Sequence, residues 1–171
     1  MHLSSFKELF WFLLCDVYAI TNQVCDELPV FIKKAHSEDL KVELQNHLTE
    51  TKAHVKNIER IFKILRVEPK KTDFGRDIKA LFSDAKALVK HNECSPLLDA
   101  AIIAILQRVE HVEIATYGTL KEYADVLDSN EIKSIINENL KEASKADSAL
   151  NKLATGGLFV TGINASATRN V

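Results

Sequence analysis

Two glutamates lie one helical turn apart in a long, largely apolar stretch of the chain. Glu110 and Glu113 fall within Ile102–Leu120, where Ile, Val and Leu recur at helical spacing. On a helix that turns by about 100° per residue, Glu113 lies in the middle of the apolar arc and Glu110 on its flank. A carboxylate in a protein core is costly unless it is paired, protonated or bound to a metal ion. These two acids are therefore the first candidates for chemistry.

The other long helices that the sequence predicts also place polar side chains on or beside their inward faces. These are Thr21 on the first helix, His47, Glu50 and His54 on the second, and Glu142 and Asp147 on the last, with Asp147 at the centre of the apolar arc. Di-metal carboxylate bundles have this layout, in which acids and histidines from facing helices converge on cations at mid-bundle. The candidate metal ligands are Glu50, His54, Glu110, Glu113, Glu142 and Asp147.

Each of these residues also has an interpretation without metal. A glutamate at the edge of an apolar stripe, such as Glu50 or Glu110, is commonly solvated. Likewise, His47 and His54 are compatible with histidines at the edge of a core. Hydrogen bonds from a tyrosine hydroxyl on a neighbouring helix would satisfy Glu113 without any ion. Both interpretations stay open from the sequence.

Composition and motifs argue against several other functions. The chain lacks a Gly-rich phosphate loop, the HExxH and GxSxG patterns and zinc-type cysteine spacing. Its 22 basic and 24 acidic residues give a net charge of −2 without a basic face, so we expect neither nucleic acid nor membrane as a partner. The apolar run Leu9–Cys15 is too short to span a bilayer. An odd count of three cysteines without a secretory signal predicts free thiols in the cytoplasm.

The elements that position these residues are predicted to be helices. Glycine and proline together number only 8 among 171 residues, which favours one all-α domain. Apolar spacing predicts long helices over residues 4–35, 37–66, 95–127 and 128–154, and a shorter one over 76–91. We expect helix starts at Ser37 and Ser95-Pro96 and a capping box at Asp128-x-x-Glu131.

This order of helices predicts a four-helix bundle over residues 1–155. One extra short helix lies in the connection between the second and third long helices, a crossover compatible with ferritin-like bundles. Residues 156–171 show no periodic pattern, so a disordered tail is expected there.

The run VEHVEIATYGTL at Val109–Leu120 resembles the hallmark of the YciE/YciF-type ferritin-like family of bacterial proteins. Supporting matches follow the same order within residues 5–155, at Asp16–Ala19, His47–Thr51, Leu98–Ala104 and Lys145–Asp147. The resemblance implies a ferritin-like domain, often a homodimer, that is associated with bacterial stress responses and has a poorly defined role. It also implies a buried di-metal site similar to that of rubrerythrin-like proteins, with matching positions at Glu50, Glu110, Glu113, Glu142 and Asp147.

The chain departs from the family pattern at three positions. Thr21 stands where the family usually has a glutamate, Ala143 replaces the second of two adjacent acids, and Thr49 replaces an acid on the second helix. Each change removes an anionic oxygen, and Mn or Fe sites need several such ligands. The sequence therefore favours a degenerate or reduced di-metal site. The alternative is a functional Fe- or Mn-binding protein with oxygen or peroxide redox chemistry; whether the protein binds a cofactor or is an enzyme stays open.

Overall fold

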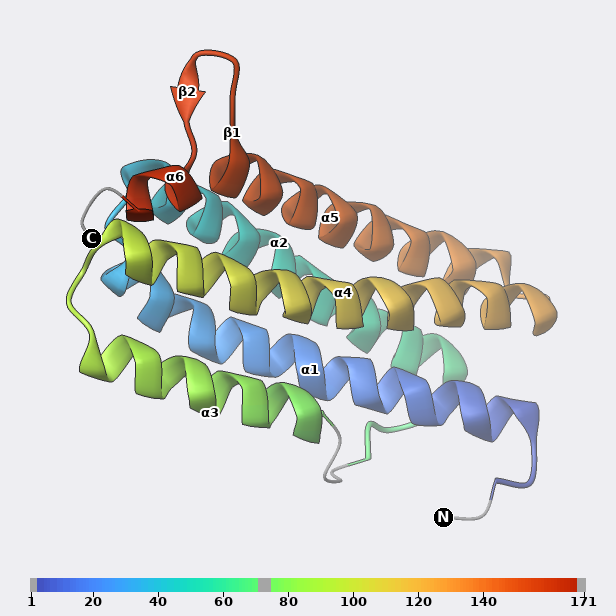
Figure 1. The fold of residues 1–171 in the computed structure, drawn as a ribbon. Coiled ribbons are helices and arrows are strands. Elements are labelled where there is room, and N and C mark those ends of the chain that lie inside the picture. Colours follow the sequence, from blue (N-terminus) through green and yellow to red (C-terminus); the bar gives the residue numbers. More distant parts are fainter. Residues whose placement is uncertain (1–2, 71–74, 169–171) are drawn as a thin grey trace.

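Five helices make up most of the protein, and a small hairpin and a sixth helix follow them (Figure 1). The computed structural model describes residues 3–70 and 75–168. The elements are α1 (Phe6–Lys34), α2 (Glu38–Leu65), α3 (Arg76–His91), α4 (Pro96–Val126), α5 (Asn130–Thr155), β1 (Gly156–Gly157), β2 (Val160–Thr161) and α6 (Ile163–Ala167). The predicted all-α class is confirmed, as is the extra short helix between the second and third long helices.

The four long helices form a ring around a shared core. Helix α1 packs against α2 and α4, and α5 packs against the same two helices, so α2 and α4 face each other diagonally. Figure 1 shows α2 and α4 running in one direction and α1 and α5 in the other. The short helix α3 covers α1 and α4 from outside. Within the described part of the chain, no helix combines the length and apolar character needed to cross a membrane.

A layer of buried polar side chains divides the core in two. On α4, Val109 belongs to one apolar cluster and Tyr117 to the other. Helix α5 is divided in the same way, between Leu150 and Ile136. Between the clusters lies the polar layer, which consists of Thr21, His47, Thr51, His54, Glu110, Glu113 and Asn139, all buried. Every long helix therefore contributes at least one polar side chain at mid-bundle.

Serine residues cap three of the long helices. The hydroxyls of Ser5, Ser37 and Ser95 accept hydrogen bonds from backbone N–H groups in the first turns of α1, α2 and α4. The predicted capping box at Asp128 is wrong, because α5 begins at Asn130 and its preceding residue makes no side-chain cap. Asp128 instead adopts a left-handed conformation with φ of 56°, which an aspartate tolerates in a tight turn.

Long-range hydrogen bonds from side chains, among them those of Asp99 and Trp11, fasten the connections of the bundle. The buried carboxylate of Asp99 on α4 accepts hydrogen bonds from the backbone N–H groups of His36 and Ser37, at 2.7 and 2.8 Å. It thereby holds the link between α1 and α2 against the start of α4. At the other end of the molecule, the Trp11 indole donates to the carbonyl of Glu68, which ties the long connection after α2 to α1.

After α5 the chain forms a small hairpin and the short helix α6, in a segment for which the sequence predicts a disordered tail. Gly156 has a φ of 75°, and a Cβ there would lie 2.4 Å from the nitrogen of Gly162, so two glycines permit this tight return of the chain. Helix α6 then packs on α4 and α5, where Ile163 is buried. A segment this short is not long enough to show a periodic pattern. Residues 169–171 lie outside the described residues.

Replacing Asp99 by alanine tests its role in fastening the fold. Asp99→Ala leaves two backbone donors without their acceptor, so the free energy of unfolding is expected to fall by about 2–4 kcal/mol. Urea denaturation followed by circular dichroism measures the change. The control is Asp84→Ala on the exposed face of α3, which is expected to change stability by less than about 0.5 kcal/mol. Equal losses in the two variants would contradict the assignment.

Candidate functional site

The centre of the polar layer is a cluster of one histidine and two glutamates. Glu110 and Glu113 project from α4 one turn apart, and both side chains are fully buried. His47 reaches them from α2 across the axis of the bundle. One potential ligand atom from each of the three residues lies within 4.8 Å of the other two. Two carboxylates and an imidazole thus share a site that is closed to water.

The hydrogen bonding of this cluster is incomplete. Glu110 Oε1 approaches His47 Nε2 at 2.7 Å, but neither oxygen of Glu110 receives an aligned donor from the described residues. In that part of the chain, Glu113 Oε2 and His47 Nδ1 are likewise without a partner. Buried polar atoms are rarely left unpaired, because each one loses its hydration without compensation. Two carboxylates and a histidine therefore still have lone pairs or protons to offer to a ligand.

Thr21 is the side chain through which α1 contacts this cluster. Its hydroxyl oxygen lies 2.8 Å from Glu113 Oε1 and 2.8 Å from the carbonyl oxygen of Val17. The Tyr117 hydroxyl lies 3.1 Å away. A threonine hydroxyl has one proton to donate and can also accept, so it donates to Glu113 or Val17 while Tyr117 donates to it. Thr21 holds Glu113 in place but adds no negative charge.

Burial and charge set the protonation of the cluster. Burial, and then the negative charge of Glu110, raise the pKa of Glu113 to about 7, against a smaller opposing effect of the Thr21 hydrogen bond. For His47, burial alone lowers the pKa, but the combined attraction of Glu110, Glu113 and Glu50 outweighs it and the pKa is raised. The raised pKa of His47 favours its protonated form beside Glu110, while Glu113 gains or loses its proton near neutral pH.

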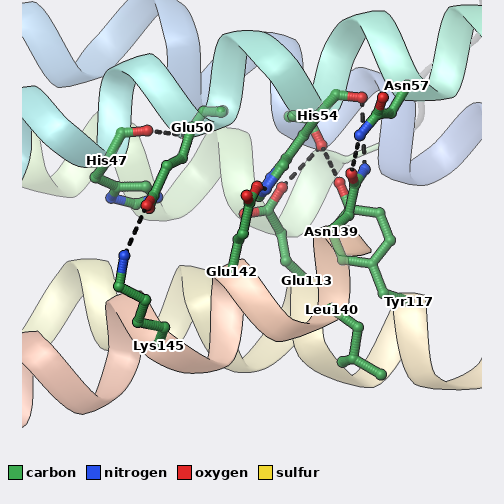
Figure 2. A network of polar contacts seen from close by, with 12 residues as sticks. His47, Glu50, His54, Asn57, Glu113, Tyr117, Asn139, Leu140, Glu142 and Lys145 are labelled. Carbon is green, nitrogen blue, oxygen red and sulfur yellow. Dashed lines mark hydrogen bonds and ion pairs between the residues drawn. The ribbon is translucent and has the colours of Figure 1, made fainter. Parts of the chain in front are cut away.

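A second set of polar residues lies beside the cluster, along the seam between α2 and α5 (Figure 2). His54 Nε2 contacts Glu142 Oε2 at 2.8 Å, and Lys145 Nζ contacts Glu50 Oε1 at 3.0 Å. Burial lowers the pKa of His54 to about 4, so its ring is neutral at pH 7. Since an ionised Glu142 can only accept, Nε2 carries the ring proton and the buried Nδ1 has a free lone pair.

Asparagines close the layer on the side towards Tyr117. The Asn57 amide donates to the side-chain oxygen of Asn139 at 2.7 Å, and the amide nitrogen of Asn139 lies 3.5 Å from the carbonyl oxygen of His54 (Figure 2). Burial raises the pKa of Tyr117 well above its usual value, so its hydroxyl stays protonated. These groups orient one another and present neutral donors at the edge of the cluster.

The structure brings together only part of the predicted ligand set. Glu110 and Glu113 lie at the centre, whereas Glu50, His54 and Glu142 lie in the adjacent seam between α2 and α5.

Asp147 is not at the centre of the inward face, because Ala143, Ala146 and Leu150 occupy that face of α5. Its side chain is 21% exposed and lies near Gln107 and His111 of α4. The predicted central position of Asp147 is wrong because the buried face of α5 runs through Ala143, Ala146 and Leu150 and leaves Asp147 at its edge. Whether Asp147 binds metal stays a prediction.

His47 and Asn139 are buried polar residues of this layer that lie outside the predicted ligand set. The sequence places His47 at the edge of the apolar stripe of the second helix and leaves a ligand role open, because its position three residues before Glu50 and seven before His54 puts all three on one face. The sequence does not single out Asn139, although it belongs to the buried series of α5, between Ile136 and Ala143. That spacing of three and four residues is the signal that would have found it.

A helical bundle with carboxylates and imidazoles buried at its middle is the class that these features define. Residues 5–166 match the model of a protein family described as a domain of unknown function, DUF892, and the chain belongs to that family. It is 29% identical over 157 residues to the protein YciF of Escherichia coli strain K12, which covers 90% of this chain and 93% of YciF. The predicted family resemblance is thus confirmed.

Solved structures agree with the family assignment. The crystal structure of YciF superposes with a TM-score of 0.83 at 28% identity, covering 88% of this chain and 95% of that one. The structure of a protein named YcfI from Rhodopseudomonas palustris superposes with a TM-score of 0.82 at 33% identity, covering 88% of this chain and 96% of that one. A protein from Xanthomonas campestris pv. campestris shares the fold alone, with a TM-score of 0.66 at 18% identity over 86% and 89% of the two chains.

The raised pKa of Glu113 makes a prediction about stability and pH. A folded-state pKa of about 7, against 4.5 unfolded, means that the native protein binds the extra proton, so stability is lost as pH rises from about 4.5 to 7. Glu113→Gln mimics the protonated acid. In chelator, the variant is expected to be more stable than wild type at pH 8, by up to about 3 kcal/mol, and nearly equal at pH 4.5.

Urea denaturation across this pH range measures the difference. Glu122→Gln, at an exposed position on the same helix, is the control and is expected to follow the wild-type pH profile. A parallel profile for wild type and Glu113→Gln would contradict a buried Glu113 that titrates near neutral pH.

Proposed function

We propose that this protein is a ferritin-like, stress-associated bundle protein that binds one divalent transition-metal ion, Fe or Mn, at a reduced di-metal site. The proposed ligands are His47, Glu110 and Glu113. The observation that supports the proposal is the set of fully buried carboxylate oxygens on Glu110 and Glu113 that have no hydrogen-bond partner among the described residues. The association with stress is carried over from YciF, which is called a stress protein.

The residues fit such an ion in distance and in donor type. An octahedral ion about 2.1 Å from each ligand needs ligand atoms roughly 3–4 Å apart, and the three candidate atoms lie within 4.8 Å of one another. A small side-chain adjustment is enough to close them on one ion. One imidazole nitrogen with carboxylate oxygens suits Fe or Mn. Two buried negative charges also supply what a dication needs for charge balance.

The neutral Thr21 is the reason for proposing one ion rather than two. A di-metal site needs carboxylates on both sides to bridge and balance two cations. On the side of α1, Thr21 contributes only a hydroxyl, and that hydroxyl is already bonded to Glu113. On α5, Ala143 contributes no ligand. The remaining acids nearby, Glu50 and Glu142, are engaged by Lys145 and His54.

The chain's own residues would orient and shield the bound ion. When bound, Fe or Mn would supply one-electron redox chemistry towards oxygen or peroxide. Such redox chemistry is the activity proposed for this protein if the metal site is functional. The hydrogen bond with Thr21 orients the side chain of Glu113, and a hydrogen bond with the Tyr117 hydroxyl orients Thr21 in turn. The apolar clusters on both sides of the polar layer exclude water.

The second candidate function is a metal-free bundle that acts by association, as a cytoplasmic homodimer. It is favoured by the ability of the cluster to compensate its own charge, since His47 faces Glu110 and the pKa of Glu113 is raised to about 7 by burial and by the charge of Glu110. In this case the buried acids are remnants of a lost metal site, and the protein acts by binding other molecules at its surface.

Elemental analysis separates the two functions. Protein purified without chelator, or reconstituted with Fe²⁺ or Mn²⁺, is expected to hold close to one ion per chain. Glu113→Ala and His47→Ala are expected to lose most of that ion. Added metal is expected to raise the melting temperature of wild type but not of these variants, because binding stabilises the native state. Glu122→Gln serves as the control and is expected to bind like wild type.

Absence of metal from the reconstituted wild type, with melting curves unchanged by added ion, would overturn the metal-binding function in favour of the metal-free bundle. Gel filtration with light scattering on the same samples tests the expected dimer.

A further inference from the structure

Charged side chains line the seam between α2 and α5 (Figure 2), and their exposed fraction falls towards the buried cluster. The Lys145 side chain is 74% exposed, Glu142 34% and Glu50 24%, whereas His47 and His54 are almost fully buried. Figure 2 shows Lys145 reaching across from α5 to Glu50 on α2. From the surface inwards, the order is the ammonium group of Lys145, the carboxylates of Glu50 and Glu142, the two histidine rings and then the buried glutamates.

We infer that Glu50, Glu142 and Lys145 form a gate through which a hydrated divalent cation reaches the buried cluster. The two carboxylates bind the cation first at the seam. Until then the ammonium group of Lys145 occupies the position of the cation, and the cation displaces it. This inference rests on the proposed metal-binding function and adds the route by which the site is loaded.

The spacing of the residues makes the gate continuous with the site. On α2, Glu50 lies three residues after His47 and four before His54, so the three side chains share one face. Across the seam, Glu142 and Lys145 are one turn apart on α5. Each partly exposed carboxylate is therefore adjacent to a buried imidazole, directly in the contact of Glu142 with His54.

The electrostatics of the seam suit a cation that binds briefly. Burial and the charge of Glu50 raise the pKa of Glu142, and Lys145 opposes this effect. Two neighbouring carboxylates thus need a positive charge, which Lys145 supplies from a flexible side chain. A largely exposed ion pair of this kind is weak, so a dication can replace the ammonium group at small cost.

His54 provides a neutral step between the carboxylates and the interior. Its Nε2 is held by Glu142, and its buried Nδ1 has no hydrogen-bond partner among the residues described. A neutral imidazole with a free lone pair is a metal ligand that adds no charge of its own. His54 can therefore coordinate the cation together with Glu142, and the cation is not held tightly because the neutral ring adds no negative charge.

Loading kinetics with Co²⁺ alone test the gate, because bound Co²⁺ has a visible absorption that stopped flow can follow. At low ionic strength, Glu50→Gln combined with Glu142→Gln is expected to load about tenfold more slowly than wild type. Lys145→Gln is expected to load about threefold faster. All variants are expected to reach the wild-type stoichiometry, and the rate differences are expected to shrink in 0.5 M salt.

Matched controls carry the same charge changes away from the seam. Glu93→Gln combined with Glu122→Gln removes two exposed carboxylates, and Lys141→Gln removes an exposed lysine one turn before Lys145 on α5. Both controls are expected to load at the wild-type rate.

Wild-type rates in all seam variants, with normal stoichiometry, would overturn the gate and leave the metal site standing. Loss of stoichiometry in the Glu50 and Glu142 variant would also overturn it, because those residues would then be ligands. Failure of wild type itself to bind Co²⁺ would remove both the gate and the site.

Discussion

The repulsion between Glu110 and Glu113 in a water-free interior is the constraint on which the rest of the polar layer depends. Two unit charges about 5 Å apart repel by about 3 kcal/mol at an effective dielectric constant of about 20, and each carboxylate also loses its hydration. A domain of this size is stabilised by only about 5–15 kcal/mol in total, so both acids cannot stay charged and uncompensated. His47 compensates one of them, and Glu113 responds through a pKa raised to about 7 by burial and by Glu110. A metal ion would compensate both.

The polar contacts that compensate these acids also fix how the helices sit against one another. Thr21 joins α1 to α4, His47 joins α2 to α4, and Asn57 joins α2 to α5 through Asn139. Apolar packing tolerates small axial shifts between helices, whereas a shift of one residue would unpair each of these groups. The layer therefore defines the register of the bundle as well as a site, and the carboxylate of Asp99 adds a similar constraint at one end.

Sequence reasoning succeeded where burial follows helical periodicity and was wrong where local geometry decides. The buried positions of Glu113 and Thr21 could be predicted because each lies between strong apolar residues on a long helix. The placement of Asp147 was wrong because the buried face of α5 runs through Ala143, Ala146 and Leu150 and leaves Asp147 partly exposed at its edge. The conformations of Asp128 and of Gly156 depend on single left-handed residues, which periodicity does not report. The cross-bundle contact of His47 with Glu110 depends on which helices lie diagonally, and one sequence does not determine that arrangement.

The central claim is that one cation occupies the space between His47, Glu110 and Glu113. Anomalous diffraction from crystals of the wild-type protein loaded with Mn²⁺ tests it most directly, since the signal locates the ion without assuming its ligands. The account predicts one anomalous peak per chain within bonding distance of all three side chains, with Thr21 outside the coordination sphere. Two peaks, a peak held by other residues, or no peak in the bundle of fully loaded protein would contradict it.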